Sequence, residues 1–232
     1  MTTKSNLPVR RLLAILAVSS ALSMSLWLAR AWYTDSRTFF FLNWNLFLAW
    51  IPLGLALLLW RVQRRALHRW LMSPAIWAAW LLFFPNAPYI LSDLMHLGAR
   101  PPAPLWFDAV MLFSFAWNGL LLGFLSLWLV QQAVAGWFGR AAGWLMAAIA
   151  LAAAGFGIYL GRFLRWNSWD LLVDPRGLAS DVLGRLTNPL AHPQTLAVTV
   201  LFGTFLLVAY LTVTLTPPFL QAVVRRGERL GD

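Results

Sequence analysis

Two acids and a histidine, in two separate polar segments, are the residues whose types and spacing could carry chemistry. Asp93 and His96 lie three residues apart and follow Pro85 and Pro88, and Asp170 lies much further along the chain. An Asp and a His one helical turn apart can form an acid–base pair or supply two ligands to a divalent metal. Asp93, His96 and Asp170 are therefore the candidate catalytic residues, and the metal ligands if a metal is bound. A solvated surface helix would carry the same Asp and His.

The first polar segment covers residues 84–97 and reads FPNAPYILSDLMHL. Its prolines end an apolar stretch, because proline lacks the backbone N–H that a helix interior needs. A short helix after Pro88 would place Tyr89, Asp93 and His96 on one face, since residues four and seven apart are neighbours on a helix. Tyr89, together with Asn86 before it, is a candidate contact for a ligand.

The second polar segment covers residues 161–170 and reads GRFLRWNSWD. It continues from an apolar stretch, so Arg162 and Arg165 are expected on one helix face just beyond the lipid. Two such guanidinium groups suit the phosphate of a lipid headgroup or of an anionic substrate. They equally suit ion pairs with nearby aspartates, or the anchoring of a helix end at the membrane surface. The candidate binding residues are Asn86, Tyr89, Asp108, Arg162, Arg165, Asn167 and Trp169. Of these, Asp108 is expected close enough to the surface to be hydrated.

The elements that position these residues are apolar. Of 232 residues, 60% are hydrophobic and 11% are charged, whereas soluble domains average about 25% charged residues. A bilayer core about 30 Å thick takes roughly 20 apolar residues in a helix. We therefore predict an all-α, polytopic membrane helical bundle with short surface helices on its outer face, one transmembrane domain over residues 1–232. The six predicted spans are residues 12–29, 38–60, 70–85, 106–130, 141–161 and 195–216.

The distribution of lysine and arginine predicts the orientation. With the N-terminus inside, eleven basic and two acidic residues face the cytoplasm, and seven basic and six acidic residues face outward. Cytoplasmic loops carry the excess of Lys and Arg, so both termini are predicted inside. The first predicted span, residues 12–29, is preceded by basic residues as a cleaved signal peptide would be, but its length favours retention as a span. The predicted cytoplasmic residues include Lys4, Arg64, Arg65 and Asp232.

Composition also excludes several classes of function. The chain has no cysteine, which rules out disulfides, cysteine–zinc sites and iron–sulfur clusters. Its net charge of +10 comes from residues that flank apolar runs, so it predicts contact with membrane lipid, with anionic headgroups, rather than with nucleic acid. No cofactor is identified. Glycine pairs at 119 and 123 and at 157 and 161 predict close helix packing.

The two polar segments resemble a bacterial family catalogued as domain of unknown function 1361. The resemblance rests on residues 84–89 continuing to Asp93 and Leu94, on the triplet at 106–108, and most specifically on residues 157–170. It spans roughly residues 45–220. It implies a multi-pass membrane protein, and it implies no activity, substrate or cofactor. The predicted location is the bacterial cytoplasmic (inner) membrane.

Three functions fit these residues. The favoured one is a non-catalytic envelope component, a binding or assembly subunit with a polar site on the outer face. An envelope protein is its expected partner, because Trp, Tyr and Arg dominate interfaces. An enzyme acting on lipid or a lipid-linked substrate at the outer leaflet would use Asp93, His96 and Asp170. A small transporter working as an oligomer is the third, although its polar residues would be expected near mid-membrane.

Overall fold

The computed structural model describes residues 7–62 and 66–231, and the regular structure within these ranges is helical. Lys4, Arg64, Arg65 and Asp232, which were assigned to the cytoplasm, lie outside them. Six of the described helical stretches are long and apolar enough to cross a membrane. The predicted polytopic helical bundle is therefore confirmed. The six begin with α1 (Leu7–Thr34), α2 (Phe41–Val62) and α3 (Ala66–Phe83), and continue with α5 (Leu105–Phe138), α6 (Arg140–Phe163) and α9 (Pro193–Gly231).

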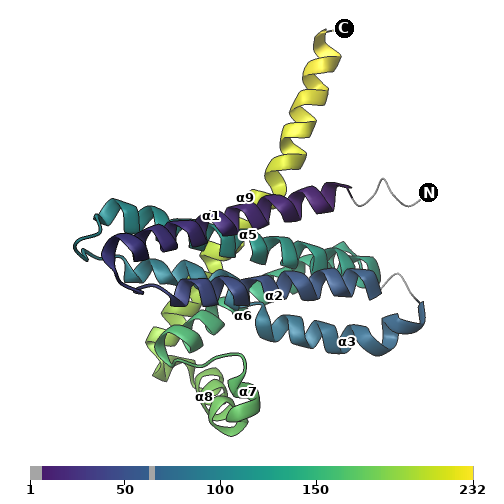
Figure 1. Ribbon diagram of the computed structural model, residues 1–232. Helices are drawn as coiled ribbons and strands as arrows, with labels where there is room; N and C mark the ends of the chain where they lie inside the picture. The colour runs from purple at the N-terminus through teal and green to yellow at the C-terminus, as the bar shows by residue number, and fades with distance from the viewer. Residues whose placement is uncertain (1–6, 63–65, 232) are drawn as a thin grey trace.

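Short helices connect the long ones on one side of the bundle. After α3 come α4 (Asn86–Tyr89) and the 3-10 helix η1 (Ile90–His96), and between α6 and α9 lie α7 (Asp170–Val173), α8 (Pro175–Thr187) and the 3-10 turn η2 (Pro189–Ala191). In Figure 1, α1, α2, α3 and α5 run side by side, and α9 crosses them obliquely before its last turns project from the bundle.

The third span does not end at residue 85, as the sequence predicted; the apolar helical stretch runs from Ser73 to His96. Two hydrogen bonds carry the chain past the prolines: the Ala87 N–H donates to the Phe84 carbonyl at 3.2 Å, and the Tyr89 N–H to the Pro85 carbonyl at 3.0 Å. Helix therefore restarts after each proline instead of stopping. The short helix expected after Pro88 is present, but as a 3-10 helix.

Glycines on α5 and α6 let this restarted segment lie between those two helices. A Cβ added to Gly119 would lie 2.5 Å from the carbonyl oxygen of Ala87, and one added to Gly157 would lie 2.7 Å from Pro85 Cβ. A Cβ on Gly161 would come within 2.9 Å of the Tyr89 ring. The predicted packing role of the glycine pairs is confirmed, and it fixes α4 against both spans.

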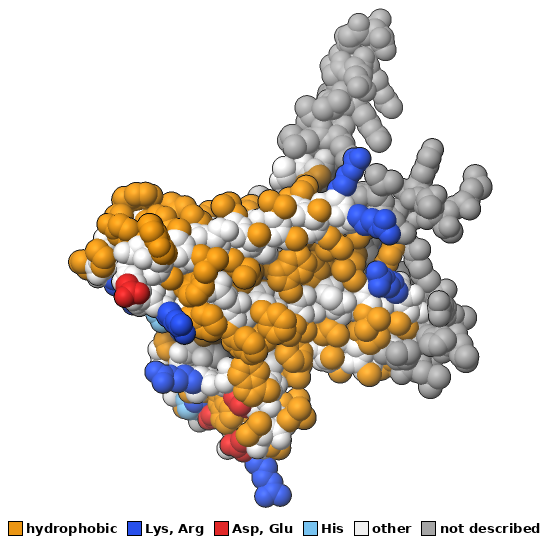
Figure 2. Space-filling model, in the orientation of Figure 1, with side chains coloured by type: hydrophobic (Ala, Val, Ile, Leu, Met, Phe, Trp, Pro, Cys, Tyr) orange, Lys and Arg blue, Asp and Glu red, His pale blue; other side chains and the backbone are white. Residues whose placement is uncertain are grey.

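Two hydrophobic clusters form the core. One joins α1, α2 and α5 and includes Leu16, Leu42, Leu53, Met111, Leu112 and Phe115. The other joins α3, α5, α6 and α9 and includes Trp80, Phe84, Leu127, Ile158, Leu206 and Tyr210. Outside this core, apolar side chains cover the flanks of the bundle (Figure 2), as a lipid-facing surface requires. Among the described side chains in the same view, the acidic ones appear at the end away from the N-terminus.

A buried ion pair joins α1 to α5 and corrects the expectation that Asp108 is hydrated. Arg30 Nε donates to Asp108 Oδ1 at 2.5 Å and Arg30 Nη2 to Oδ2 at 3.1 Å, and the two side chains are 3% and 1% exposed. Asp108 lies in the first turn of α5, but α1 extends past it and covers it with an arginine. Deeper in the same interface, Asn118 donates to Ser23 Oγ at 2.9 Å.

Candidate functional site

The guanidinium group of Arg162, at the end of α6, gathers the polar residues of the first segment around it. It forms an ion pair with Asp93, and it donates to Ser92 Oγ from Nε at 3.1 Å and from Nη2 at 2.8 Å. Nη1 lies 2.7 Å from His96 Nε2, and the guanidinium carbon lies 4.7 Å from the centroid of the Tyr89 ring. The expectation that Tyr89, Asp93 and His96 share a face agrees with this geometry. Of the ion-pair partners considered for Arg162, Asp93 is the one observed.

The other side of the Asp93 carboxylate is held by α2. Asn45 Nδ2 donates to Asp93 Oδ2 at 2.9 Å, so α2, η1 and α6 meet at one carboxylate. The Arg162 and Asp93 side chains are 13% and 1% exposed. A buried carboxylate is tolerated when it is paired and hydrogen-bonded in this way. The cluster carries no excess charge from this pair.

His96 is oriented by two contacts. Its ring lies edge-on to Phe41, with centroids 5.0 Å apart, and its Nε2 faces Arg162. A guanidinium group can only donate hydrogen bonds, so Nε2 accepts, and its lone pair is engaged. The candidate acid–base pair of Asp93 and His96 is therefore bridged by an arginine, because both side chains bond to Arg162 rather than to each other.

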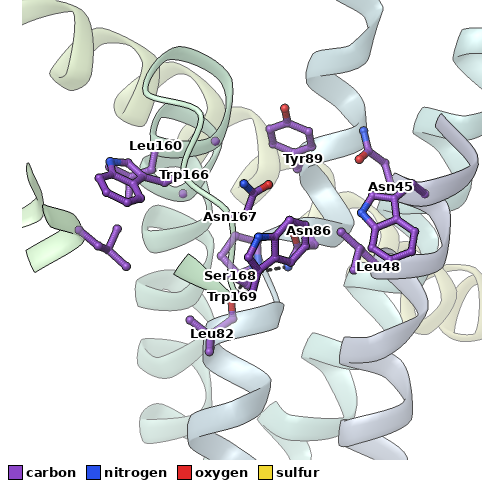
Figure 3. Close-up of a pocket in the computed structure, with 15 residues that line it drawn as sticks. Asn45, Leu48, Leu82, Asn86, Tyr89, Leu160, Trp166, Asn167, Ser168 and Trp169 are labelled. Atoms are coloured by element: carbon purple, nitrogen blue, oxygen red, sulfur yellow. Dashed lines mark hydrogen bonds between the residues drawn. The ribbon is translucent and has the colours of Figure 1, made fainter. Parts of the chain in front are cut away.

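A cavity of about 330 Å³ lies next to this cluster. Figure 3 shows Asn45 and Leu48 on one side of it and Leu160 and Trp166 on the other, with Asn167 between them. Its walls come from α2, α3, α4, α6, the loop at 164–169 and α8. They comprise Trp44, Asn45, Leu48, Leu82, Pro85, Asn86, Tyr89, Gly157, Leu160, Gly161, Trp166, Asn167, Ser168, Trp169 and Leu178.

Hydrogen bonds hold the loop at 164–169 over the cavity. Asn86 Nδ2 donates to Ser168 Oγ and to the Phe83 carbonyl, both at 2.9 Å, and Ser168 Oγ donates to the Leu82 carbonyl at 3.2 Å. The bond between Asn86 and Ser168 is visible in Figure 3. Across the cavity, the rings of Trp44 and Trp169 meet edge to face, with centroids 6.4 Å apart. The loop is thus a fixed wall.

Arg162 and Arg165 do not share a helix face, contrary to the expectation from their spacing. The α6 helix ends at Phe163, and Arg165 has a φ of 64°. This left-handed conformation reverses the chain direction, so the exposed Arg165 side chain does not continue the helix face that carries Arg162. The reversal also brings Trp166 back to the bundle, where its backbone N–H donates to the Leu160 carbonyl at 3.1 Å.

Asp170 stays in the loop and does not join Asp93 and His96. It accepts the Asn167 backbone N–H at 2.7 Å and the Asn167 side chain at 3.3 Å, just where α7 begins. Its carboxylate therefore stabilises the turn. Among the described residues, no group of three His, Asp or Glu side chains could hold a metal ion.

The loop is also tied to α8 through one aspartate. Trp166 Nε1 donates to Asp181 Oδ2 at 2.7 Å, and Arg185 Nη1 lies 2.8 Å from Asp181 Oδ1. The hydrogen bond from Trp166, aided by Arg185, lowers the pKa of Asp181 below its ordinary value. The predicted surface helix contributes Leu178 to the cavity wall.

The structure separates the sequence-predicted residues into three places. Four line the cavity: Asn86, Tyr89, Asn167 and Trp169. Asp93, His96 and Arg162 form the cluster beside it, and Asp108, Arg165 and Asp170 lie elsewhere. Sequence reasoning missed Trp44, Asn45, Ser92, Trp166 and Ser168. Asn45 could have been found, because an amide within an apolar stretch faces the bundle interior by default.

Fold and site together define a multi-pass helical membrane protein with a cavity of mixed polar and apolar lining near one end of its bundle. The family described as protein of unknown function (DUF1361) matches residues 44–209, so the chain belongs to that family. The matched region contains every residue that lines the cavity. No curated protein and no solved structure matches the chain.

Proposed function

We propose that this protein is a non-catalytic membrane binding subunit that holds the polar headgroup of an amphipathic ligand in the cavity beneath the 164–169 loop. The observation that carries the proposal is the mixed lining of the cavity. Asn45, Asn86 and Tyr89 supply polar groups, whereas Leu48 and Leu160 come from the apolar faces of spans. Small-molecule sites combine an apolar wall with a few placed polar groups in this way.

The geometry of the Arg162 cluster favours binding over catalysis. A general base needs a lone pair within reach of its substrate, but the Asp93 carboxylate is buried and accepts from Arg162 and Asn45. The Nε2 of His96 is likewise engaged by Arg162. These groups support the cavity wall, in the manner of residues that hold a binding site in shape.

Exposed apolar side chains next to the cavity support an amphipathic ligand. Leu172 and Val173 of α7 are 86% and 77% exposed, and Leu183 and Leu186 of α8 are 59% and 62% exposed. A short helix with such side chains lies in a membrane interface. The cavity wall formed by α8 would then border the lipid, and a headgroup could enter with its chain still in the membrane. The charge distribution along the chain supports an outward position for this side.

Bound lipid in the purified protein tests the proposal. Native mass spectrometry of protein extracted from its own membranes is expected to detect a retained amphiphile, which Trp169→Ala loses. Trp106→Ala is the matched control, because Trp106 is also exposed but does not line the cavity. Retention that is the same in wild type and in Trp169→Ala, or lost equally in both variants, would overturn the proposal.

A further inference from the structure

We propose that the cavity selects an uncharged, hydroxyl-rich headgroup, that is, a sugar or polyol unit. This inference rests on the proposed function and names the class of ligand that the same cavity takes. It departs from the anionic headgroup that the arginines of the sequence suggested. Three features of the cavity support it: the balance of charge, the unused hydrogen-bond acceptors, and the paired tryptophans.

The balance of charge disfavours an ion. Within the described structure, the cavity lining contains no Lys, Arg, Asp or Glu. Arg162, whose guanidinium group lies over the Tyr89 ring of the lining, is matched by Asp93, and its Nε, Nη1 and Nη2 already contact Ser92, His96 and the Asp93 carboxylate. A phosphate in the cavity would lose hydration without gaining a free cation. An uncharged headgroup avoids this penalty.

The amide oxygens of the lining that remain open require a ligand that donates. Asn45 Nδ2 already donates to Asp93. Asn86 Nδ2 already donates to Ser168 and to the Phe83 carbonyl. Their Oδ1 atoms, and the Tyr89 hydroxyl, have no hydrogen-bond partner among the described residues, and all three residues line the cavity. Amide oxygens accept hydrogen bonds, which hydroxyl groups can donate and which phosphate or trimethylammonium groups cannot.

The tryptophans supply flat apolar surfaces for such a ligand. Trp44 on α2 and Trp169 on the loop are 50% and 38% exposed and meet at an interplanar angle of 64°. Sugar rings present faces of C–H groups, which are attracted to the negative face of an aromatic ring. The cavity volume of about 330 Å³ is at the small end of ligand sites, which suits a single sugar unit. Asn86 is hydrogen-bonded to Ser168, the residue that precedes Trp169, so stacking and hydrogen bonding can act on one unit.

The test is calorimetric titration of the full chain in phosphatidylcholine nanodiscs, with empty nanodiscs as the blank and detergents kept below solubilising concentrations. The probes are octyl glucoside, octylphosphocholine and tetraoxyethylene octyl ether, which share an eight-carbon chain and differ in headgroup. Octyl glucoside is expected to bind, and Trp169→Ala to weaken it about tenfold. Trp169→Phe, which keeps a ring, should lose less, and Trp106→Ala should leave binding unchanged.

The outcomes separate the two proposals. Trp169-dependent binding of octylphosphocholine or of the tetraoxyethylene ether, without octyl glucoside, would keep the proposed function and overturn the sugar class. Binding of none of the three would overturn both, as would glucoside binding that is equal in wild type and Trp169→Ala. Methyl glucoside, which lacks the chain, distinguishes the source: binding equal to that of octyl glucoside indicates a free sugar, and weaker binding indicates a lipid-linked one. Either result supports the headgroup class, but equal binding of methyl glucoside would overturn the amphipathic ligand of the proposed function.

Discussion

The guanidinium group of Arg162 and the carboxylate of Asp93 form a buried ion pair across 69 residues of chain. The pair locks the end of α6 to η1, the segment that restarts after the prolines. The cavity lies on the adjacent surface, and Tyr89 belongs to both, because it lines the cavity and its ring lies under Arg162. The shape of the cavity therefore depends on this pair.

Neutralising one member of the pair is expected to destabilise the bundle. Asp93→Asn or Arg162→Gln leaves the opposite charge buried without a partner, which costs about 3–5 kcal/mol. The double variant, which has no unpaired charge, should recover part of this loss. The measurement is the loss of helical circular dichroism during SDS titration. Arg165→Gln, at an exposed arginine, is the control and should behave as wild type. The prediction would be contradicted if the double variant lost as much stability as the two single variants lose together.

Adding a methyl group to Gly119 is expected to push α4 away from α5. The Cβ of Gly119→Ala would lie 2.5 Å from the Ala87 carbonyl oxygen, a backbone atom that cannot rotate aside. Overpacking of this kind costs about 1–3 kcal/mol. Gly54→Ala is the matched control: it also lies within a span, but its Cβ meets nothing within 4 Å. The control should be neutral or stabilised, since alanine favours helix over glycine. Equal unfolding midpoints for the two variants would show that α4 is not wedged there.

The spans could be predicted from sequence because each long apolar stretch leaves few alternatives to a membrane helix. The convergence of Tyr89, Asp93 and His96 also followed from local helical spacing. The partner of Asp93 on α2, Asn45, could not be chosen, because 48 residues separate the two and no local rule selects the contact. The separation of Arg165 from Arg162 depended on one left-handed residue, which a helical pattern does not predict for arginine.

The burial of Asp108 also lay beyond sequence reasoning, and it leads to a prediction for α1. Arg30 binds Asp108 with two hydrogen bonds, a geometry that a guanidinium group provides and an ammonium group does not. Arg30→Lys is therefore expected to weaken the interface of α1 and α5, and Arg30→Gln to weaken it more, by about 3 kcal/mol or above. SDS titration again measures the effect. Arg37→Gln, at an exposed arginine of the following turn, should have none. Full stability in Arg30→Lys would mean that charge alone matters there.

The bond between Trp166 and Asp181 predicts an acid-sensitive loop outside the membrane spans. The pKa of Asp181 is lowered from 3.8 in the folded protein, first by the Trp166 N–H and then by Arg185. Because the pKa is lowered on folding, ionised Asp181 stabilises the fold at any pH above its unfolded pKa. This stabilisation is lost as the pH falls through the pKa that Asp181 has in the folded protein. The fluorescence of Trp166, obtained by subtracting the spectrum of Trp166→Phe, is expected to shift to the red below pH 3.8. Asp181→Asn should show the shifted emission already at neutral pH, whereas Asp35→Asn, at an exposed acid far along the chain, should keep the wild-type profile. An emission maximum that does not change with pH in wild type would mean that the loop is held without this bond.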